Sequence, residues 1–374
     1  MDILFDSLGA LVSSFQLLSI GQVVMWCIGG ILIYLAIAKE MEPTLLLPMG
    51  FGTILVNIPA VDAITEHGAL TTLFHAGIAN ELFPLLLFIG IGAMIDFGPL
   101  LSNPKLLLFG AAAQFGIFFT LMLANGLFGF AVNDAASIGV IAAADGPTAI
   151  FVANTLHSQY SGAIIVAAYS YMALVPMIQP PVIKLLTTKK ERLIRMPYEP
   201  ADVTKTTRIL FPIVITMIAA LVAPLSASLV FFLMFGNLIR ECGVLDSLSE
   251  TAQKVLANLV TILLGISVAL QMQAAQFLKF ETLLILCLGL LGFVFDTFGG
   301  VMFAKLLNLF SKKKINPMIG AAGISAFPMS GRIVHKMGLK EDPQNFLLMH
   351  SIGVNVSGQI ASVIAGGLIL SFFG

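Results

Sequence analysis

Long runs of apolar residues, separated by short polar or glycine- and proline-rich stretches, dominate the chain. A helix that spans a membrane needs about 20 consecutive, predominantly apolar residues, and several of these runs reach that length. The pattern predicts an all-α polytopic membrane protein with about ten full spans and two broken segments, 135–156 and 316–334. We place the full spans at 20–38, 43–60, 81–101, 105–130, 161–186, 208–223, 225–240, 254–272, 281–309 and 345–372.

The first broken segment contains an acid where an apolar span would otherwise continue. Asp145 is followed at once by Gly146 and Pro147, the residue types that most readily end a helix. At membrane depth a helix break is tolerated only where its backbone is buried in protein or lines a wet cavity, and an intramembrane acid indicates a functional site. The alternative is a helix that ends near the membrane surface, with Asp145 in water.

The two halves of the chain share an order of elements that predicts an internal repeat. At a constant offset, Gly139 matches Gly320, Pro147 matches Pro328 and Ser170 matches Ser351. If each broken segment enters the membrane and returns on the same side, all Lys and Arg residues except Lys279 lie at or near one face, together with the basic loop 187–207. That face is cytoplasmic by the positive-inside rule. The halves are then inverted repeats whose re-entrant hairpins meet near the midplane, as in transporters that alternate access.

This topology divides the chain into four parts. We expect N-terminal scaffold spans at 1–80, a first inverted repeat at 81–186, a basic cytoplasmic loop with two linking spans at 187–253, and a second inverted repeat at 254–374. The N-terminus holds Asp2 and Asp6 but no basic residue before the first apolar run, which predicts that the first span is retained rather than cleaved.

Composition and motifs exclude several functional classes. Of 374 residues, 58% are hydrophobic and 10% charged, with a net charge of −1 that gives no indication of nucleic-acid binding. The three cysteines, Cys27, Cys242 and Cys287, are too widely spaced for a metal cluster. No phosphate-binding loop, dinucleotide fingerprint or nucleophile elbow occurs, so direct use of ATP is not expected.

The second broken segment and the last span supply neutral oxygen groups. Asn316 and Ser325 lie in a glycine-rich stretch, and Asn355 lies on a helix face with Ser351 and Gln359. Such oxygens, with a carboxylate, suit a hard monovalent cation such as Na⁺. The alternative is that these groups only hold tightly packed helices together.

Two further groups remain open. Tyr171 can relay a proton if its helix places it deep in the membrane, whereas Tyr169 has the character of an interfacial tyrosine. Asp296 is the other acid far from a span end, and no helix break accompanies it. His335 and His350 are expected near cytoplasmic ends, in contact with water.

Several motifs together resemble the beta subunit of the sodium-translocating biotin-dependent decarboxylases. They are Ala144–Phe151, Tyr169–Pro176, Gln179–Pro181, Asn316–Arg332, and Asn355 with Gly358. This family includes oxaloacetate, methylmalonyl-CoA, glutaconyl-CoA and malonate decarboxylases. The resemblance implies a subunit of the bacterial cytoplasmic (inner) membrane that decarboxylates carboxybiotin and uses the reaction to export Na⁺, taking up a proton.

The resemblance also implies roles and partners. Asp145 is a sodium ligand that alternates with a proton, Tyr171 relays the proton, and Arg332 holds the carboxybiotin carboxylate, while Asn316, Ser325 and Asn355 complete the cation sites. The expected partners are a carboxyltransferase alpha subunit, a biotin carrier protein and a small membrane gamma or delta subunit, with a homotrimer possible. The residues alone leave two alternatives: a secondary transporter, either a Na⁺-coupled carboxylate carrier or a Na⁺/H⁺ antiporter, and a structural membrane anchor.

The substrate of such a complex is chosen by the alpha subunit. The short N-terminal region and compact length favour an acyl-CoA, methylmalonyl-CoA or glutaconyl-CoA, over oxaloacetate.

Overall fold

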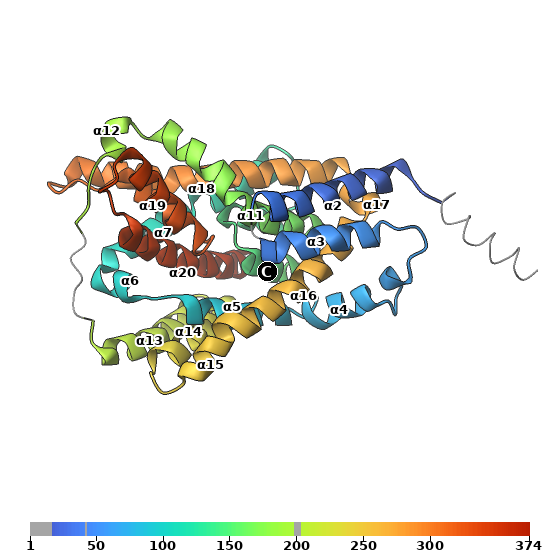
Figure 1. Cartoon of the computed structure of the whole chain (residues 1–374), viewed down its shortest axis with the longest axis horizontal. Helices are drawn as coiled ribbons and strands as arrows, with labels where there is room; N and C mark the ends of the chain where they lie inside the picture. The colour runs from blue at the N-terminus through green and yellow to red at the C-terminus, as the bar shows by residue number, and fades with distance from the viewer. Residues whose placement is uncertain (1–16, 42, 198–202) are drawn as a thin grey trace, which may run out of the picture. The chain divides into compact units, whose positions relative to one another are not determined.

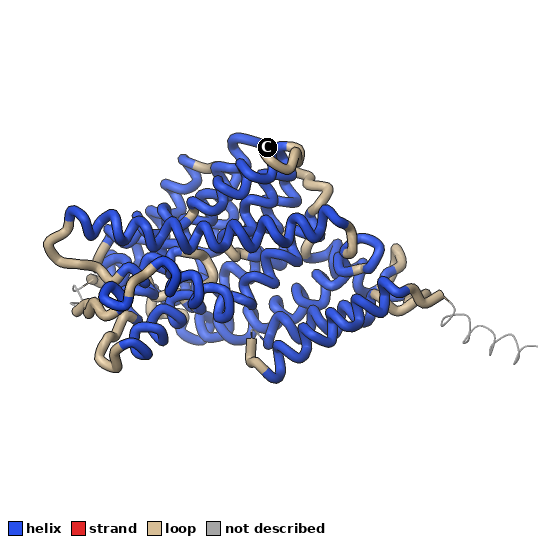
Figure 2. The backbone as a smooth tube through the Cα atoms, turned by 90° about the horizontal axis from the view of Figure 1, so that it is seen from above, coloured by secondary structure: helices blue, strands red, loops and turns tan. Residues whose placement is uncertain are grey.

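The computed structural model is built of helices throughout the part of the chain that it describes, residues 17–41, 43–197 and 203–374 (Figure 2). The predicted features at Asp2 and Asp6 lie outside these residues. Seven helical segments in the described ranges are long and apolar enough to cross a membrane. They run over Ile20–Ala38, Pro104–Gly126, Ser161–Leu186, Lys205–Val222, Asp246–Met272, Phe280–Phe310 and Leu348–Phe373. The prediction of an all-α polytopic membrane protein is therefore confirmed.

Three predicted spans correspond to shorter helices. α3 (Pro43–Val56), α5 (Leu82–Met94) and α14 (Ala227–Glu241) have only 14, 13 and 15 residues. The segment Asp62–Gly77 and α5 together are apolar enough for one span that is bent by 56°. The described residues thus contain seven helices that could span a membrane, or eight if the bent pair is one span, whereas hydropathy predicts about ten. The two numbers differ because hydropathy does not show where a helix bends or ends.

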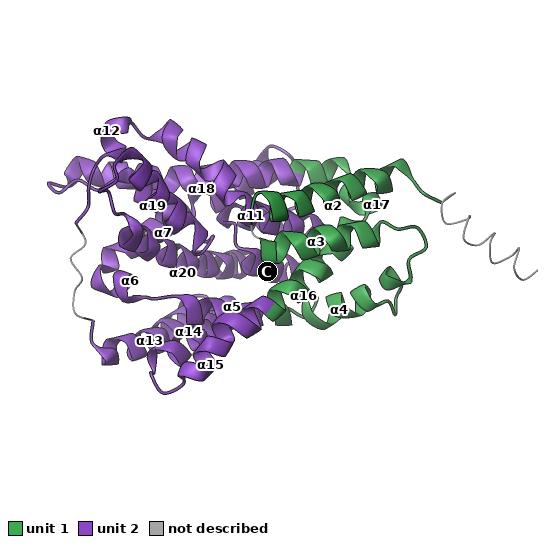
Figure 3. Cartoon of the chain, viewed as in Figure 1, with its two compact units in different colours: residues 1–83, 259–284 green, residues 84–258, 285–374 purple. Residues whose placement is uncertain are grey.

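The chain folds into two compact units (Figure 3). Unit 1 comprises residues 1–83 and 259–284, and its helices include α2 (Ile20–Ala38), α3, α4 (Ala69–Gly77) and α17 (Ala274–Phe277). Inside it α2 and α3 approach closely, since a Cβ on Gly29 would lie 2.7 Å from the Gly50 carbonyl oxygen. The predicted repeat boundaries, 81–186 and 254–374, stay a prediction.

Unit 2, residues 84–258 and 285–374, holds every predicted site residue. The boundaries between the units fall within α5, α16 (Ala257–Val268) and α18 (Phe280–Phe310). The remaining helices of unit 2 are α6 (Gly98–Ser102), α7 (Leu107–Ala113), α8 (Phe115–Gly126), α9 (Val132–Val140), α10 (Gly146–Thr155), α11 (Ser161–Leu186), α12 (Lys189–Arg192), α13 (Lys205–Val222), α14, α15 (Asp246–Glu250), α19 (Met329–Glu341) and α20 (Leu348–Phe373), most of which are labelled in Figure 1.

The first broken segment is a re-entrant hairpin. Helix α9 enters, a 3₁₀ turn at Ile141–Ala143 forms the tip, and α10 returns. The two ends of the hairpin are joined, because the Asn133 side chain donates to the Leu156 carbonyl at 3.3 Å and Ser158 Oγ donates to Asp134 at 2.6 Å. A segment that crossed the membrane would have placed these ends on opposite faces.

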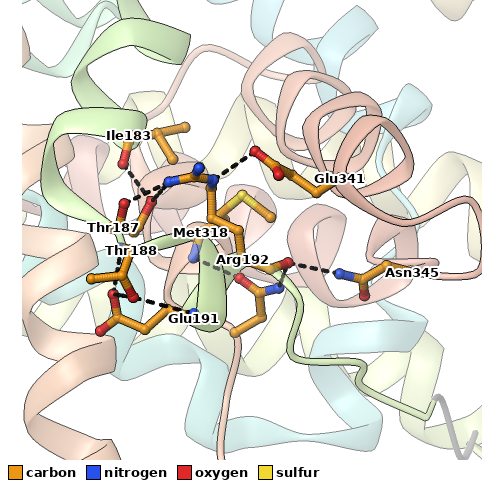
Figure 4. A network of polar contacts seen from close by, with 9 residues as sticks. Ile183, Thr187, Thr188, Glu191, Arg192, Met318, Glu341 and Asn345 are labelled. Carbon is orange, nitrogen blue, oxygen red and sulfur yellow. Dashed lines mark hydrogen bonds and ion pairs between the residues drawn. The ribbon is translucent and has the colours of Figure 1, made fainter.

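The second broken segment is also a hairpin. It consists of a 3₁₀ stretch at Pro317–Gly323, a turn, and α19. Asn316 and Asn345, at its two ends, donate to the same Arg192 carbonyl at 2.9 and 3.0 Å. Arg192 also forms an ion pair with Glu341 at 2.7 Å, and Figure 4 shows this base network.

Within unit 2, the two hairpins begin near opposite ends of α11. The first hairpin leads directly into Ser161, whereas the second is held at Arg192, just beyond Leu186. A helix of 26 residues is about 39 Å long, which is the thickness of a bilayer with part of its headgroup region. The tips nevertheless meet, because the Ser325 N–H donates to the Ala143 carbonyl at 3.1 Å. Two opposed hairpins whose tips touch are the arrangement that the sequence predicts.

Candidate functional site at the hairpin tips

Asp145 lies buried at the tip of the first hairpin, with 3% of its surface exposed. Its Oδ2 accepts hydrogen bonds from Thr148 Oγ1 at 2.7 Å, Ser362 Oγ at 2.8 Å and Gln359 Nε2 at 3.2 Å. The Thr148 N–H lies 3.3 Å from Oδ1. No Lys or Arg side chain forms an ion pair with Asp145 among the described residues, so neutral groups alone surround this carboxylate.

Local backbone chemistry sets the position of this acid. Ala144 has left-handed dihedral angles, φ 51° and ψ 44°, which reverse the chain after the 3₁₀ turn. Asp145 is the N-cap of α10, and Pro147 occupies its first turn, where the missing N–H costs nothing. Gly146 is required because a Cβ there would lie 2.4 Å from the Tyr169 ring. The Asp-Gly-Pro sequence thus places a carboxylate at the positive end of a helix.

The second hairpin and α20 complete the surroundings. Ser325, at the second tip, directs its hydroxyl toward the Gly358 carbonyl at 3.4 Å. The Asn355 side chain donates to the Ile324 carbonyl at 2.7 Å, while its Oδ1 is buried and has no hydrogen-bond partner among the described residues. Gly358 allows this approach, since a Cβ there would lie 2.1 Å from the Gly323 carbonyl oxygen. α20 therefore contacts the tips of both hairpins.

The structure brings some of the predicted site residues together and separates others. Asp145, Ser325 and Asn355 lie at the tips. Asn316 lies at the base of the second hairpin, where its Oδ1 caps the Met318 N–H at 3.1 Å and its Nδ2 holds the chain at Arg192. Arg332 is in the first turn of α19 with an exposed side chain.

The two tyrosines have different surroundings. The Tyr171 hydroxyl donates to the Leu286 carbonyl of α18. Tyr169, 1% exposed, lies directly against Gly146, and its hydroxyl has no partner among the described groups. The interfacial interpretation of Tyr169 is therefore wrong.

Sequence reasoning missed Thr148 and Ser362. Both are fully buried donors to Asp145. A signal existed for Thr148, because an N-cap acid commonly pairs with the third residue that follows. Ser362 continues the predicted polar face of Ser351, Asn355 and Gln359, three residues further along.

A pocket of about 560 Å³ lies at the base of the second hairpin. Its lining includes Asn103, Arg195, Lys313, Lys314, Met349 and His350. His350 lines this pocket but is only partly exposed, and its Nε2 is buried, as is Nδ1 of His335, so the predicted contact of these rings with water is not confirmed. Arg195 is also paired with Asp342 at 2.6 Å, and this hydrogen bond holds the pKa of the Asp342 carboxyl below its usual value.

Comparisons with known proteins agree with this architecture. The family model described as "Na+-transporting oxaloacetate decarboxylase beta subunit" matches residues 21–373. The chain is 47% identical to the methylmalonyl-CoA decarboxylase subunit beta of Propionigenium modestum, with 97% of each chain covered. It is 49% identical to the glutaconyl-CoA decarboxylase subunit beta of Acidaminococcus fermentans, covering 97% of this chain and 96% of the relative. It is 44% identical to the oxaloacetate decarboxylase beta chain of Klebsiella pneumoniae, covering 98% and 99%.

Proposed function

The chain belongs to the family of Na⁺-transporting decarboxylase beta subunits, the membrane subunits of sodium-pumping decarboxylases in the bacterial inner membrane, and from that premise we propose that Asp145 binds the transported Na⁺. Membership in this family decides against a secondary transporter without chemistry. The observation that carries the proposal is a buried carboxylate among neutral donors, where the tips of two opposed hairpins touch.

The residues at the tips fit a hard cation. A buried carboxylate without a basic partner is stable when a cation or a proton neutralises it. Asn355 Oδ1 is a buried amide oxygen that no described group satisfies, and such an oxygen is available to a cation. Ser325 Oγ, from the second hairpin, contacts α20 at the Gly358 carbonyl, three residues beyond Asn355. Asp145, Ser325 and Asn355 are therefore the proposed Na⁺ ligands at the tips. Asn316 is proposed as a further Na⁺ ligand, at the base of the second hairpin.

Exchange of Na⁺ for a proton at Asp145 couples transport to the reaction. When the N–COO⁻ bond of carboxybiotin breaks, CO₂ leaves and the ring nitrogen takes up one proton. Tyr171 is the proposed relay for that proton. Movement of the tips past α20 would then expose Asp145 to the two faces of the membrane in turn, as opposed repeats do in transporters.

The pocket at the base of the second hairpin is the proposed site of arrival for carboxybiotin. Lys313 and Lys314 offer positive charge to a carboxylate, and Met349 offers an apolar surface to the biotin rings. α20 begins at this pocket and reaches Asp145 at Gln359, ten residues and about 15 Å further on. Arg332 is proposed to contact the carboxylate as it moves inward.

The proposed assembly includes a carboxyltransferase alpha subunit, a biotin carrier protein and a small membrane subunit, with the chain as a trimer. An acyl-CoA is the proposed substrate, because the acyl-CoA decarboxylase subunits are the more similar of the relatives named above. Reconstitution with each type of alpha subunit tests this choice: CO₂ release should be faster with the acyl-CoA enzyme's subunit than with that of oxaloacetate decarboxylase.

The central test is CO₂ release from carboxybiotin by the purified membrane complex, titrated with Na⁺. We expect saturable activation by Na⁺ in the native protein, loss of that activation in Asp145→Asn, and its retention in Asp134→Asn. Asp134 is a matched control because it is also buried, 2% exposed, but is bonded to Ser158 and Gln159 at the base of the first hairpin. Unchanged Na⁺ activation in Asp145→Asn would disprove the role of Asp145 and favour a structural anchor.

A further inference from the structure

A second buried acid lies in unit 2 and takes no part in the proposed Na⁺ site. Asp296, in the middle of α18, is 0% exposed. Neither of its carboxyl oxygens has a hydrogen-bond partner among the described groups. In this respect it differs from Asp145, whose carboxylate accepts hydrogen bonds from three side chains.

Asp296 faces a break in a membrane span that the sequence did not reveal. The span Pro104–Gly126 is interrupted at Gln114, where α7 ends and α8 begins. A Cβ on Gly116, in the first turn of α8, would lie 2.4 Å from Asp296 Oδ1. The backbone N–H groups of Gly116 and Ile117 act on the carboxyl, but neither forms a hydrogen bond with it among the described groups, and the Ile117 N–H donates to the Gln114 carbonyl at 3.2 Å. The prediction that no helix break accompanies Asp296 holds for its own helix, since α18 is continuous from Phe280 to Phe310, but a break lies in the neighbouring span.

The position of Asp296 relates it to both hairpins. One turn earlier in α18, a Cβ on Gly292 would lie 2.7 Å from the Ala142 side chain at the first tip. One turn later, a Cβ on Gly300 would lie 2.1 Å from the Gly320 carbonyl oxygen in the second hairpin. Asp296 thus lies on the stretch of α18 that packs against both hairpins, whose tips are proposed above to move past α20.

The immediate surroundings contain no charge that would hold Asp296 in one state. No charged side chain acts on it among the described residues. The other titratable groups of this part of α18 are Cys287, nine residues before it, and Lys305, nine residues after it. From the neighbouring helices, Tyr171 contacts α18 at Gly289, about two turns away. Thr120, beside Gly292, is polar but does not titrate.

We propose that Asp296 is a proton-binding site of the transport core, separate from Asp145, which holds a proton in this conformation and releases it when α18 moves against the break between α7 and α8. The neutral acid suits the present surroundings because an unpaired carboxylate is strongly disfavoured when it is buried. A small approach to the first turn of α8 would let the Gly116 N–H donate to the carboxylate, and the Ile117 N–H could turn to it from the Gln114 carbonyl, so that a helix N-terminus stabilises the anion. The coupling of this proton to transport rests on the proposed function, whereas its binding does not.

Infrared difference spectroscopy of the purified complex between neutral and alkaline pH tests the proposal directly. We expect a carbonyl band from a protonated carboxyl in the native protein that Asp296→Asn removes and the control Asp134→Asn retains. Asp296→Glu should shift the band rather than remove it, which assigns the signal if Asp296→Asn fails to assemble. A native protein whose carboxyl bands are unaffected by both substitutions would overturn the proposal, because Asp296 would then be a permanently charged cap of α8.

A second measurement tests the link to transport. The pH dependence of the Na⁺ activation constant should become shallower in Asp296→Asn, by up to about one proton. A slope equal to that of the native protein would refute coupling even if the infrared band is assigned. These results are separable from failure of the proposed function, because the infrared titration needs neither carboxybiotin nor Na⁺ transport.

Discussion

Removal of the Ser362 hydroxyl should weaken Na⁺ binding without dismantling the site. Ser362 Oγ donates to Asp145 Oδ2 at 2.8 Å, and both side chains are buried. A hydrogen bond to a charged group contributes about 1.5–3 kcal/mol, and one between neutral groups about 1 kcal/mol. The difference, about 0.5–2 kcal/mol, favours the carboxylate over the protonated acid. Ser362→Ala should therefore shift the competition at Asp145 toward the proton and raise the Na⁺ activation constant about tenfold at neutral pH.

The expected effect depends on pH in a definite direction. At alkaline pH Asp145 carries no proton in either protein, so the competition disappears and the two activation constants should converge. The assay is CO₂ release by the membrane complex, with Na⁺ titrated at several pH values. Ser357→Ala is the matched control, because Ser357 is also buried in α20 but donates to the Val354 carbonyl at 2.6 Å. An increase that is independent of pH, or equal in both variants, would refute the reasoning.

Two further predictions concern the hairpins themselves. Gly320→Ala would place a Cβ 2.0 Å from the Gly300 carbonyl oxygen, so it should lower the free energy of unfolding by about 1–3 kcal/mol and with it the melting temperature. The control Gly126→Ala, whose Cβ would have no neighbour within 4 Å, should leave the stability unchanged or raise it. Differential scanning calorimetry distinguishes them, and equal melting temperatures would contradict the close contact. At the hairpin base, the hydrogen bond from Arg195 lowers the pKa of Asp342, so its stabilising contribution is present above the unfolded pKa of about 4 and disappears as pH falls through the lowered value. Hydrogen exchange of residues 342–345, corrected for intrinsic rates, should increase over that range. Arg195→Gln should make the step smaller and leave the part that comes from the Gln344 N–H, which also donates to Asp342 at 3.0 Å; a step of unchanged size would exclude the ion pair as a cause.

The hairpins could be predicted because their signals are local. The Gly-Pro pair after Asp145 and the glycine-rich stretch before Arg332 lie within otherwise apolar runs, and glycine and proline disfavour a continuous helix through their backbone geometry. The span 161–186 likewise agrees with α11 at both ends. The distribution of Lys and Arg then favours hairpins over full crossings, and the hydrogen bonds that join the two ends of each segment are consistent with hairpins.

The break between α7 and α8 carries no comparable sequence signal. Residues 107–126 contain no proline, and Gln114 is followed by Phe115 and Gly116 in an otherwise apolar run. Hydropathy therefore predicts one continuous span. The interruption becomes understandable only from packing, because the first turn of α8 lies against Asp296 of α18, 180 residues further along the chain.

The partners of Asp145 show where sequence reasoning ends and packing begins. Periodicity places Asn355, Gln359 and Ser362 near one face of α20, but it does not determine which of them reaches the first hairpin. That choice depends on the rotation of α20 against the tips, which close glycine contacts fix: Gly358 lies against the Gly323 carbonyl, and the depth of that contact sets Gln359 and Ser362 opposite Asp145. Asn355, about one turn earlier, is thereby directed to the second tip instead, where its Nδ2 donates to the Ile324 carbonyl and its Oδ1 has no partner in the part of the chain that the structure describes. A site built between opposed hairpins is thus specified less by its ligands than by the small residues that let the backbones approach.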